Sequence, residues 1–575
     1  MAVTIIKNNN GGLSNGETRV INRLRALYQD DNSTAYIYMQ PKIGDLAVDF
    51  IILDNQRGIC IVETKDWLAE DIQSVDETTI VLQDIIENNP LHEMEQFVAT
   101  CRGILESEIG AVGKIFAHTI LINITDAQFE EFPQLEPLRS CFSNEQYRAI
   151  TLGTLFDEEE GPIDNLELVK TALLPEIRVY GDLALDSEQE NFVRRMPYGH
   201  YLVTGMPGSG KTIILIARAI HLIKENPDWR IKILTYNNSM ALIIAKKLNI
   251  IAQYYRSNPY LNNVNLNRIS VNTFHKTALD TANFSADYLD EVDMTREWWD
   301  DELPATALEK AEPKYDAVLI DEYQDFKTDW IRLAIKLCKD YEYTNSSGTT
   351  HVGVNLFLAG DTLQGIYNPV NHHWFADFEL DMRGRIKYLK TCYRTGKQNT
   401  FLAIKFLQNH PRLSYEVNKF YKADIDVDIK FGECNECDNI EYLEGGYEGV
   451  CDKIQALVDE GTELDEILVL CKTQETCEDI ISSLPQQLSC AFVTDADHNQ
   501  LTNHIKFSTY QSSKGLEVKT VILVDTDQFT SDSEQELLDR KLFYVGITRA
   551  LENLVIHANN FEEPSFAAEL KAIVV

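Results

Sequence analysis

The sequence lacks any apolar run approaching the roughly 18 residues that a membrane-spanning helix requires, and it has no low-complexity tract or internal repeat. These absences argue against a membrane protein and against a repeat solenoid. Residues 1–16 also lack the basic segment and apolar block of a secretory signal. We therefore expect a globular protein of the cytoplasm that has no membrane partner.

Positive charge is scarce in this chain. It carries 52 Lys and Arg residues against 90 Asp and Glu residues, a formal net charge of −38. Because nucleic-acid phosphates are bound by Lys and Arg, the mean field of such a protein repels DNA. Indiscriminate binding of polyanions is therefore excluded, and any nucleic-acid path must be a local basic groove. A solubilising surface is the plain interpretation of the acidic excess.

The length and the apolar pattern indicate several domains of mixed structure. A chain of 575 residues is long enough for three or four domains of ordinary size. Apolar runs of strand length, such as 47–53, 201–203 and 317–320, alternate with helical stretches. This alternation predicts an α/β fold class.

A glycine-rich segment lies between a predicted strand at 201–203 and a predicted helix at 213–223. It reads Gly-Met-Pro-Gly-Ser-Gly-Lys-Thr and matches the phosphate loop G-x-x-x-x-G-K-[ST] in the context that this loop needs. Its backbone N–H groups would surround the β-phosphate, its lysine would reach the β- and γ-phosphates, and its threonine hydroxyl would bind Mg²⁺. The sequence therefore predicts the nucleotide-binding residues Gly205, Gly208, Ser209, Gly210, Lys211 and Thr212.

Two consecutive carboxylates, Asp321 and Glu322, end the apolar run 317–320. They would leave the carboxyl end of a strand beside the phosphate loop. Asp321 is the candidate Mg²⁺ ligand, and Glu322 is the candidate that orients or deprotonates the attacking water. A solvated pair of turn carboxylates is the alternative.

Further segments follow the phosphate loop in a defined order. They are Asp-Glu-Tyr-Gln-Asp at 321–325, Gly-Asp-Thr-Leu-Gln-Gly-Ile-Tyr at 360–367, Tyr-Arg at 393–394, Ser-Lys-Gly-Leu-Glu at 513–517 and Tyr-Val-Gly-Ile-Thr-Arg-Ala at 544–550. In this order and spacing they resemble the UvrD/Rep-like superfamily 1 helicases over roughly residues 185–556. The resemblance implies two RecA-like lobes that close around ATP. It also implies that the protein moves in the 3′ to 5′ direction and that it moves along DNA rather than RNA.

The same resemblance assigns roles by position. It implies an adenine-edge contact at Gln189, an adenine stack at Tyr393, a γ-phosphate sensor at Gln364, and a ribose contact at Glu517 beside Gly515. Arg394 and Arg549 stand where the family places its two γ-phosphate arginines. Since these arginines belong to the second lobe, hydrolysis would require the cleft to close.

For single-stranded nucleic acid the resemblance points to Phe274, Tyr367, Trp374 and Thr509, where rings stack on bases and polar groups hold phosphates. Each aromatic residue is equally well explained as part of a core. Gln511 stands where the family usually has histidine, and only a short stretch separates a predicted strand at 466–471 from Ser508. That stretch leaves no room for a large accessory insertion, so duplex unwinding is less strongly expected than translocation.

Near the N-terminus, residues 44–54 and 58–65 read as two strands joined by a tight turn. Asp49 lies on the first, while Glu63 and Lys65 are two residues apart on the second and share one face. This D…E-x-K arrangement is typical of nucleases, in which the carboxylates bind Mg²⁺ or Mn²⁺ and the lysine positions the nucleophile. An ordinary solvated hairpin is the alternative.

Residues around this hairpin extend the pattern. Glu17 opens a helical stretch, and Asn89-Pro90 precedes a helical stretch that contains Gln96. Together with the hairpin they resemble the nuclease-related domain NERD, a branch of the PD-(D/E)XK fold, over roughly residues 10–125. The resemblance implies that Glu17 joins Asp49 and Glu63 as a metal ligand and that Gln96 contacts the metal site or the substrate.

These features predict an N-terminal PD-(D/E)XK nuclease-like domain (1–175), a first RecA-like lobe with a small insertion (176–385) and a second RecA-like lobe (386–575). The leading hypothesis is an ATP-dependent helicase or translocase on single-stranded or partly duplex DNA, coupled to a metal-dependent DNA nuclease, in bacterial anti-phage defence or DNA repair. The alternatives are an ATP-driven nucleic-acid sensor with a non-cleaving docking domain and an ATPase that acts on RNA. A second subunit or a partner protein could complete the machine.

Overall fold

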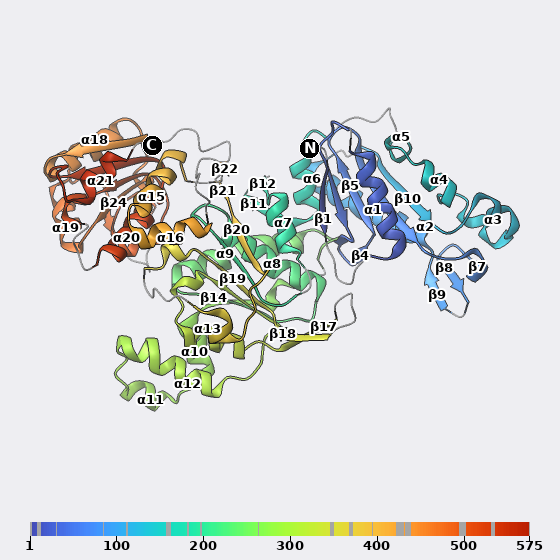
Figure 1. Ribbon diagram of the computed structural model, residues 1–575, viewed down its shortest axis with the longest axis horizontal. Coiled ribbons are helices and arrows are strands. Elements are labelled where there is room, and N and C mark those ends of the chain that lie inside the picture. Colours follow the sequence, from blue (N-terminus) through green and yellow to red (C-terminus); the bar gives the residue numbers. More distant parts are fainter. Residues whose placement is uncertain are drawn as a thin grey trace.

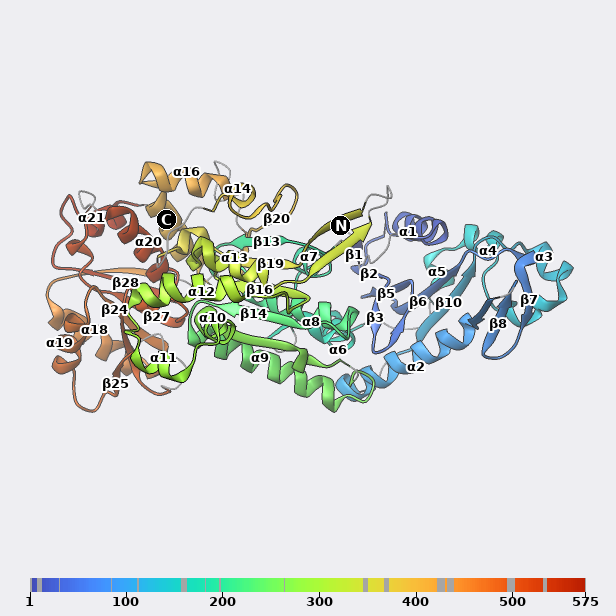
Figure 2. The ribbon, with the colours of Figure 1, turned by 90° about the horizontal axis from the view of Figure 1, so that it is seen from below.

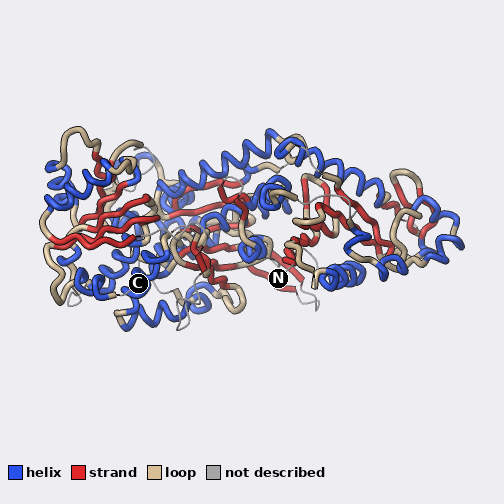
Figure 3. The backbone as a smooth tube through the Cα atoms, turned by 90° about the horizontal axis from the view of Figure 1, so that it is seen from above, coloured by secondary structure: helices blue, strands red, loops and turns tan. Residues whose placement is uncertain are grey.

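The chain folds into three bodies that follow one another along its long axis (Figure 1). The computed structural model describes residues 3–7, 13–29, 31–83, 85–110, 113–156, 163–180, 183–195, 198–262, 264–344, 350–366, 372–393, 395–420, 430–431, 439–493, 502–530 and 535–573. In each body, strands form a sheet that helices cover (Figure 3). The predicted α/β class is therefore confirmed. None of the helices in these ranges is both long and apolar enough to cross a membrane.

The N-terminal domain is built on a mixed sheet. Its order is β1 (Val3–Lys7), β2 (Ala35–Met39), β5 (Phe50–Asp54), β6 (Gly58–Lys65) and β10 (Ile115–Leu121). The central pairs β2–β5 and β5–β6 are antiparallel, whereas β1 and β10 pair in parallel with β2 and β6. Helix α1 (Asn15–Leu27) packs on the face that contains Phe50 and Ile52, and α2 (Pro90–Ile109) packs on the face that contains Ile51 and Leu53. Because both faces are covered, β5 is apolar along most of its length.

The remaining elements of this domain extend its edges. They are β3 (Lys42–Ile43), β4 (Leu46–Ala47), the meander β7 (Ile72–Val75), β8 (Thr79–Leu82) and β9 (Ile85–Asn88), and the helices α3 (Asp126–Glu131), α4 (Asn144–Ala149), α5 (Leu152–Leu155) and α6 (Leu166–Leu173). A turn η3 (Pro175–Ile177) and the short pair β11 (Arg178–Tyr180) and β12 (Leu183–Ala184) lead into the first lobe.

The first lobe contains a parallel sheet. Its order is β15 (Ile269–Thr273), β14 (Ile231–Thr235), β16 (Ala317–Asp321), β19 (Leu356–Gly360), β13 (Tyr201–Gly205) and β20 (Ile386–Leu389). The described helices include α7 (Ser187–Val193), α8 (Lys211–Glu225), α9 (Asn238–Ser257), α10 (Phe274–Ala282), α11 (Ala286–Glu291), α12 (Leu303–Lys310), α13 (Thr328–Lys336) and α14 (Trp374–Phe378), with a hairpin of β17 (Asp340–Thr344) and β18 (Thr350–Val354). Because β20 pairs with β13, this sheet extends to Leu389, four residues past the predicted boundary at 385.

The second lobe repeats the parallel design. The sheet order is β23 (Asn439–Glu444), β28 (Ala550–Ala558), β27 (Val518–Leu523), β24 (Ile467–Cys471), β26 (Ile505–Thr509) and β25 (Cys490–Phe492). Its described helices include α15 (Lys397–Gln408), α16 (Pro411–Phe420), α18 (Tyr447–Asp459), α19 (Gln474–Ser483), α20 (Glu536–Ile547) and α21 (Phe566–Ala572). Burial on both faces explains the continuous apolar run of β24 and the apolar second half of β27.

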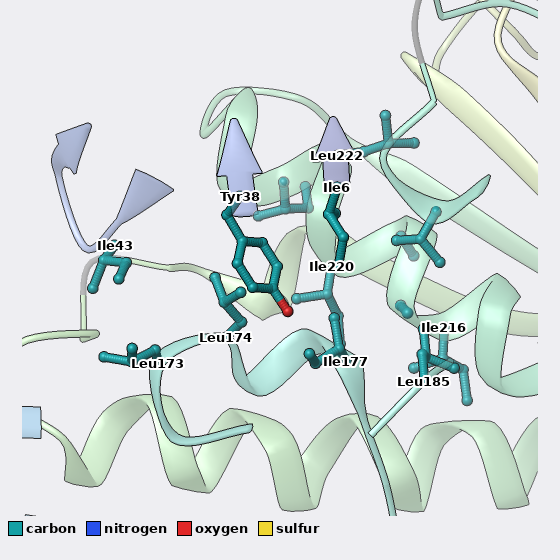
Figure 4. Packing of buried hydrophobic residues seen from close by; sticks show 14 of the residues in the cluster. Ile6, Tyr38, Ile43, Leu173, Leu174, Ile177, Leu185, Ile216, Ile220 and Leu222 are labelled. Carbon is teal, nitrogen blue, oxygen red and sulfur yellow. The ribbon is translucent and has the colours of Figure 1, made fainter. Parts of the chain in front are cut away.

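The N-terminal domain packs directly on the first lobe. One buried apolar cluster contains Ile6 and Tyr38 of the N-terminal sheet together with Leu174, Ile177 and Ile220, which belong to α6–η3 and α8 (Figure 4). Helices α2 and α9 lie along the same side of the molecule across this junction (Figure 2). The N-terminal domain therefore shares a core with the first lobe.

Candidate functional site

The phosphate loop lies between β13 and α8, as the sequence predicts. Gly210 has a φ of 87° and is the N-cap of α8, a left-handed conformation that glycine adopts without strain. Lys211 Nζ donates to the carbonyl oxygens of Gly205 and Met206 at 2.8 and 2.9 Å, so the ammonium lies inside the curl of the loop. The loop thus gathers a lysine and a helix N-terminus, which suits a phosphate.

The two predicted carboxylates lie next to this loop. Thr212 Oγ1 donates to Asp321 Oδ2 at 2.9 Å, while Asp321 Oδ1 is buried and accepts no hydrogen bond within the described residues. Burial and the charge of Glu322 raise the pKa of Asp321 to about 7. An orphaned carboxylate oxygen beside a threonine hydroxyl fits a Mg²⁺ ligand pair, because a cation would satisfy both groups.

Glu322 is held in a polar setting just beyond β16, where it adopts a φ of 55°. Burial raises the pKa of Glu322, but the positive charges of Lys514 and Lys211 outweigh burial and lower it to about 2. The carboxylate is therefore ionised across the ordinary pH range, as a group that accepts a proton from water must be.

Lys514 brings the second lobe to this carboxylate. Its Nζ lies 3.4 Å from Glu322 Oε2, forms an ion pair with Asp325 and donates to the carbonyl oxygen of Gln364 at 3.3 Å. Lys514 lies in the Ser-Lys-Gly-Leu-Glu segment, but the sequence alone does not predict this ion-pairing role. The sequence offers one signal for this role. Lys514 stands in the same motif as Gly515 and Glu517, which were predicted to bind the nucleotide.

Helix α20 makes a second contact between the lobes. Tyr544 Oη donates to Asp361 Oδ2 at 3.2 Å, and Lys541 Nζ donates to the carbonyl oxygen of Thr362 at 3.0 Å. Gln364 Nε2 donates to the same Asp361 oxygen at 3.1 Å. The predicted γ-phosphate sensor is therefore tied to the second lobe through Asp361.

The predicted adenine contacts also lie together. Gln189 Nε2 donates to the carbonyl oxygen of Ser209 at 3.0 Å. Tyr393 donates its backbone N–H to the carbonyl oxygen of Gly208 at 3.1 Å, and its hydroxyl bonds to Asp186, the N-cap of α7. The structure thus brings Gln189 and Tyr393 to the same side of the phosphate loop.

The remaining nucleotide candidates occupy the second lobe. Gly515 lines a small pocket with Glu322 and Lys514, and Glu517 is half-buried at the start of β27. Arg549 is buried, and its guanidinium donates to the carbonyl oxygens of Val545 and Leu516 at 3.0 and 3.3 Å. Arg394 lies outside the described residues.

Replacing Lys514 with methionine should make ATP turnover sensitive to acid. With one of its two positive neighbours lost, the pKa of Glu322 should rise. A larger fraction of Glu322 is then protonated as the pH falls, and a protonated carboxyl group cannot accept a proton from water. We expect kcat to fall between about pH 8 and about pH 5 more steeply in the methionine variant than in the wild type. A pH profile of kcat measures this, and Lys514→Arg, which keeps the charge, is the matched control. Superimposable profiles of the methionine variant and the wild type would exclude this role.

The structure corrects one nucleic-acid prediction. Phe274 is 1% exposed and stacks on Trp330 with ring centroids 4.4 Å apart, in a cluster that includes Phe326. A ring packed on both sides offers no face to a base, so Phe274 belongs to the core. Its neighbours Thr273 and His275 instead line a pocket of about 390 Å³ with Tyr236.

The other single-strand candidates are dispersed. Trp374 is half-buried and lines an apolar groove of about 610 Å³ with Phe375, whose ring is 74% exposed. Thr509 ends β26, and its hydroxyl accepts from the N–H of Ser512 at 3.2 Å. Tyr367 lies outside the described residues. Tyr236 and Phe375, which line these two pockets, belong to none of the sequence motifs.

The N-terminal carboxylates form a compact cluster. Asp49 Oδ2 accepts from the N–H of Thr64 at 2.6 Å, and the N–H of Asp49 donates to Glu63 Oε2 at 3.1 Å. Lys65 Nζ pairs with Glu63 Oε1 at 2.9 Å. Burial, the charge of Glu63 and the neighbouring Glu17 raise the pKa of Asp49 to about 9. The three residues of the D…E-x-K pattern and Glu17 are therefore close together.

Helix α1 positions Glu17 beside them through a capping box with Ser14. Glu17 accepts from the N–H of Ser14 at 2.6 Å and from Gln40 Nε2 at 3.0 Å. The predicted Gln96 is exposed, and its amide contacts the His92 ring at 2.7 Å. Glu93, one turn earlier on α2, is close enough for its negative charge to act on Glu63 and Lys65, in addition to the effects that these two residues have on each other.

This cluster differs from a metal site in its arrangement. Its donor set of three carboxylates suits Mg²⁺ or Mn²⁺, but protein donors already engage both oxygens of Glu17 and of Glu63. In the part of the chain that the structure describes, no three His, Cys, Asp or Glu side chains are placed to hold a metal ion. A metal ion could bind here only if Glu17 and Glu63 exchanged these protein donors for it.

Comparison with known proteins identifies the two lobes. Residues 185–303 and 287–369 match the UvrD/REP helicase N-terminal domain, and residues 504–557 match the UvrD-like helicase C-terminal domain. None of the curated proteins matches. The C-terminal domain of a possible DNA helicase from Lactobacillus plantarum has 20% identity and a TM-score of 0.20, with 29% of this chain and 86% of that chain covered.

The two matched domains contain the phosphate loop, Asp321, Glu322, Lys514 and Arg549, whereas the N-terminal carboxylates lie outside the matched residues. Two parallel sheets are also the architecture expected of RecA-like lobes. Residues 185–369 and 504–557 are therefore similar to the N-terminal and C-terminal domains of UvrD-like helicases, and an additional domain precedes them in the chain.

Proposed function

We propose that this chain is an ATP-driven translocase or helicase that acts on DNA. The observation that supports this function best is the position of Lys514, which joins the second lobe to Glu322 and Asp325 beside the phosphate loop. A nucleotide in that loop would lie between two bodies, so its binding and hydrolysis would change how they meet. Motion of one lobe against the other is how ATP turnover becomes movement along a strand.

The residues divide the chemistry between them. Lys211 and the amides of the phosphate loop would bind the phosphates. Thr212 and Asp321 would hold Mg²⁺, which neutralises phosphate charge when it is bound. Glu322, kept ionised by Lys514 and Lys211, would orient the attacking water and accept its proton. Arg549 would stabilise the charge that develops on the γ-phosphate.

Stimulation of ATP turnover by nucleic acid tests this proposal. We expect single-stranded DNA to raise kcat at least about tenfold, because DNA must favour the closed arrangement of the lobes for the motor to couple. RNA of the same length and sequence is the comparison. Stronger stimulation by RNA would indicate an ATPase that acts on RNA. The absence of stimulation by either nucleic acid would contradict the proposed motor function.

We propose in addition that the N-terminal cluster cleaves DNA in a metal-dependent reaction. The support is the residue set Glu17, Asp49, Glu63 and Lys65 and its proximity on adjoining elements. A nuclease domain joined to a DNA motor suits bacterial DNA repair or defence against invading DNA. A sensor with a non-cleaving docking domain is the second candidate, and the hydrogen bonds that already engage Glu17 and Glu63 favour it.

Cleavage of labelled DNA in Mg²⁺ or Mn²⁺ separates these two candidates. We expect cleavage by the wild type, loss on chelation, and a fall of at least about 10²-fold in Glu63→Gln and in Lys65→Ala, because each removes a charged group from the cluster. Glu87→Gln on the exposed strand β9 is the matched control and should cleave normally. If the wild type shows no metal-dependent cleavage, with or without ATP, the non-cleaving docking domain is the supported candidate.

A further inference from the structure

The helix that carries Gln189 contacts the N-terminal domain on one side. Helix α7 has seven residues, and its Asn191 side chain bonds to the edge of β1, where its Nδ2 donates to the Ile5 carbonyl at 3.4 Å and its Oδ1 accepts from the Lys7 N–H at 3.2 Å. Tyr38 of β2 donates its hydroxyl to Glu190 Oε2 at 3.2 Å. Glu190 directly follows Gln189.

The carboxylate that receives Tyr38 is fully buried and belongs to a fixed network. Glu190 Oε1 accepts from Arg194 Nε at 3.1 Å, and Arg194 Nη2 donates to Glu176 Oε1 at 3.0 Å. Lys224, in the last turn of the phosphate-loop helix α8, donates to the same Glu176 oxygen at 2.9 Å. A buried charge is stable only when donors satisfy it, so the Tyr38 hydroxyl helps to fix Glu190.

The other side of α7 faces the phosphate loop. Gln189 Nε2 donates to the Ser209 carbonyl in the phosphate loop, and Asp186 at the helix N-cap receives the Tyr393 hydroxyl. Such a short helix has little stability of its own. Its position is therefore set by the groups on its two sides, the N-terminal domain and the phosphate loop.

The docking of the N-terminal domain is close enough to act as a fixed support. The Tyr38 ring points into the apolar cluster between Leu174, Ile177 and Ile220 (Figure 4). At Gly44 a Cβ atom would lie 2.5 Å from the carbonyl oxygen of Tyr260 in the first lobe, so the two backbones approach without a side chain between them. A buried apolar interface of this kind resists relative motion of domains.

We propose that Tyr38 is a positioning residue for adenine recognition, which makes the N-terminal domain a structural part of the ATP site. Through Glu190 and the edge of β1, this domain holds α7 so that Gln189 faces the base of a bound adenine nucleotide. Side chains that select a ligand must be held by supporting groups to be precise. This inference rests on the proposed ATP hydrolysis and on the role of Gln189 in it.

Removal of one hydroxyl tests the inference. Tyr38→Phe should raise the KM for ATP about tenfold, the effect of losing one hydrogen bond to a buried charged group, and lower the preference for ATP over GTP by a similar factor. It should change kcat less than about twofold, because the loss concerns binding of the base and not the reacting phosphate. Tyr36→Phe is the matched control: it removes the same group from the same strand, but its partner is Glu167 on α6 at 3.4 Å.

A double variant shows whether Tyr38 acts through Gln189. In the Gln189→Ala background, Tyr38→Phe should leave the ratio of ATP to GTP kcat/KM unchanged, since the group being positioned is gone. Asn191→Ala, which loosens α7 from β1, should reproduce the single Tyr38→Phe effect and provides the test if Tyr38→Phe fails to fold by thermal melting. A Tyr38→Phe enzyme with the KM and selectivity of Tyr36→Phe would overturn the inference, as would additive effects in the double variant. A wild type that does not hydrolyse ATP would instead overturn the proposed function.

Discussion

Replacing Arg549 with alanine should lower the kcat of ATP hydrolysis by about 10³-fold, the usual effect of removing an arginine that stabilises γ-phosphate charge. ATP should still bind, because the phosphate loop and Lys211 belong to the first lobe. The Arg549 guanidinium lies inside the second lobe on the carbonyl oxygens of Val545 and Leu516. We expect it to act only when the lobes close. Single-turnover hydrolysis, together with equilibrium binding of ATP, separates the two effects.

Lys519→Ala is a suitable control for this variant. Lys519 is a half-buried cation on β27 that pairs with Glu552 at 3.6 Å, so its removal takes one positive charge from the same lobe without touching the site. Turnover of the Lys519 variant should match that of the wild type. If Arg549→Ala also hydrolyses ATP at the wild-type rate, Arg549 does not contact the γ-phosphate.

Glu322→Gln should abolish most turnover while it leaves the shape of the site intact. The amide is as large as the carboxylate but cannot accept a proton, so kcat should fall about 10²- to 10⁴-fold, the range for loss of a general base. ATP binding should persist or tighten, since a negative charge beside the phosphates is lost. Pre-steady-state measurement of phosphate formation isolates this step from product release.

Asp316→Asn controls for loss of a carboxylate from the same part of the sheet. Asp316 precedes β16 at the end opposite Glu322, where it pairs with Lys339 at 2.9 Å. Its variant should hydrolyse ATP normally, at some cost in thermal stability. Comparable turnover in Glu322→Gln and the wild type would show that another group activates the water.

The features that the sequence could predict are those encoded in consecutive residues. The phosphate loop and the strand that ends at Asp321 depend on local patterns, and the structure has both where they are expected. The two carboxylates of the D…E-x-K pattern are likewise close because a tight hairpin fixes the register of β5 against β6. The α/β class is confirmed for the same reason, since apolar runs of strand length mark buried parallel strands.

Burial and contacts between distant segments could not be predicted in this way. Phe274 lies in a motif, but its burial depends on Trp330, which stacks on it from α13. The contact of the Gln96 amide with His92, one turn earlier on α2, likewise depends on side-chain packing that the sequence pattern does not record. The contact of Tyr38 with Glu190 joins two domains, and no local pattern records it.

Displacement of streptavidin from biotin-labelled single-stranded DNA is the most direct test of an ATP-driven motor. With ATP, the wild type should displace streptavidin from the 5′ end, because a motor that moves in the 3′ to 5′ direction reaches that end. The Lys211→Ala variant should not displace it. Glu322→Gln should be as inactive as Lys211→Ala. Hydrolysis of ATP without displacement from either end, or displacement that does not need ATP, would contradict the account.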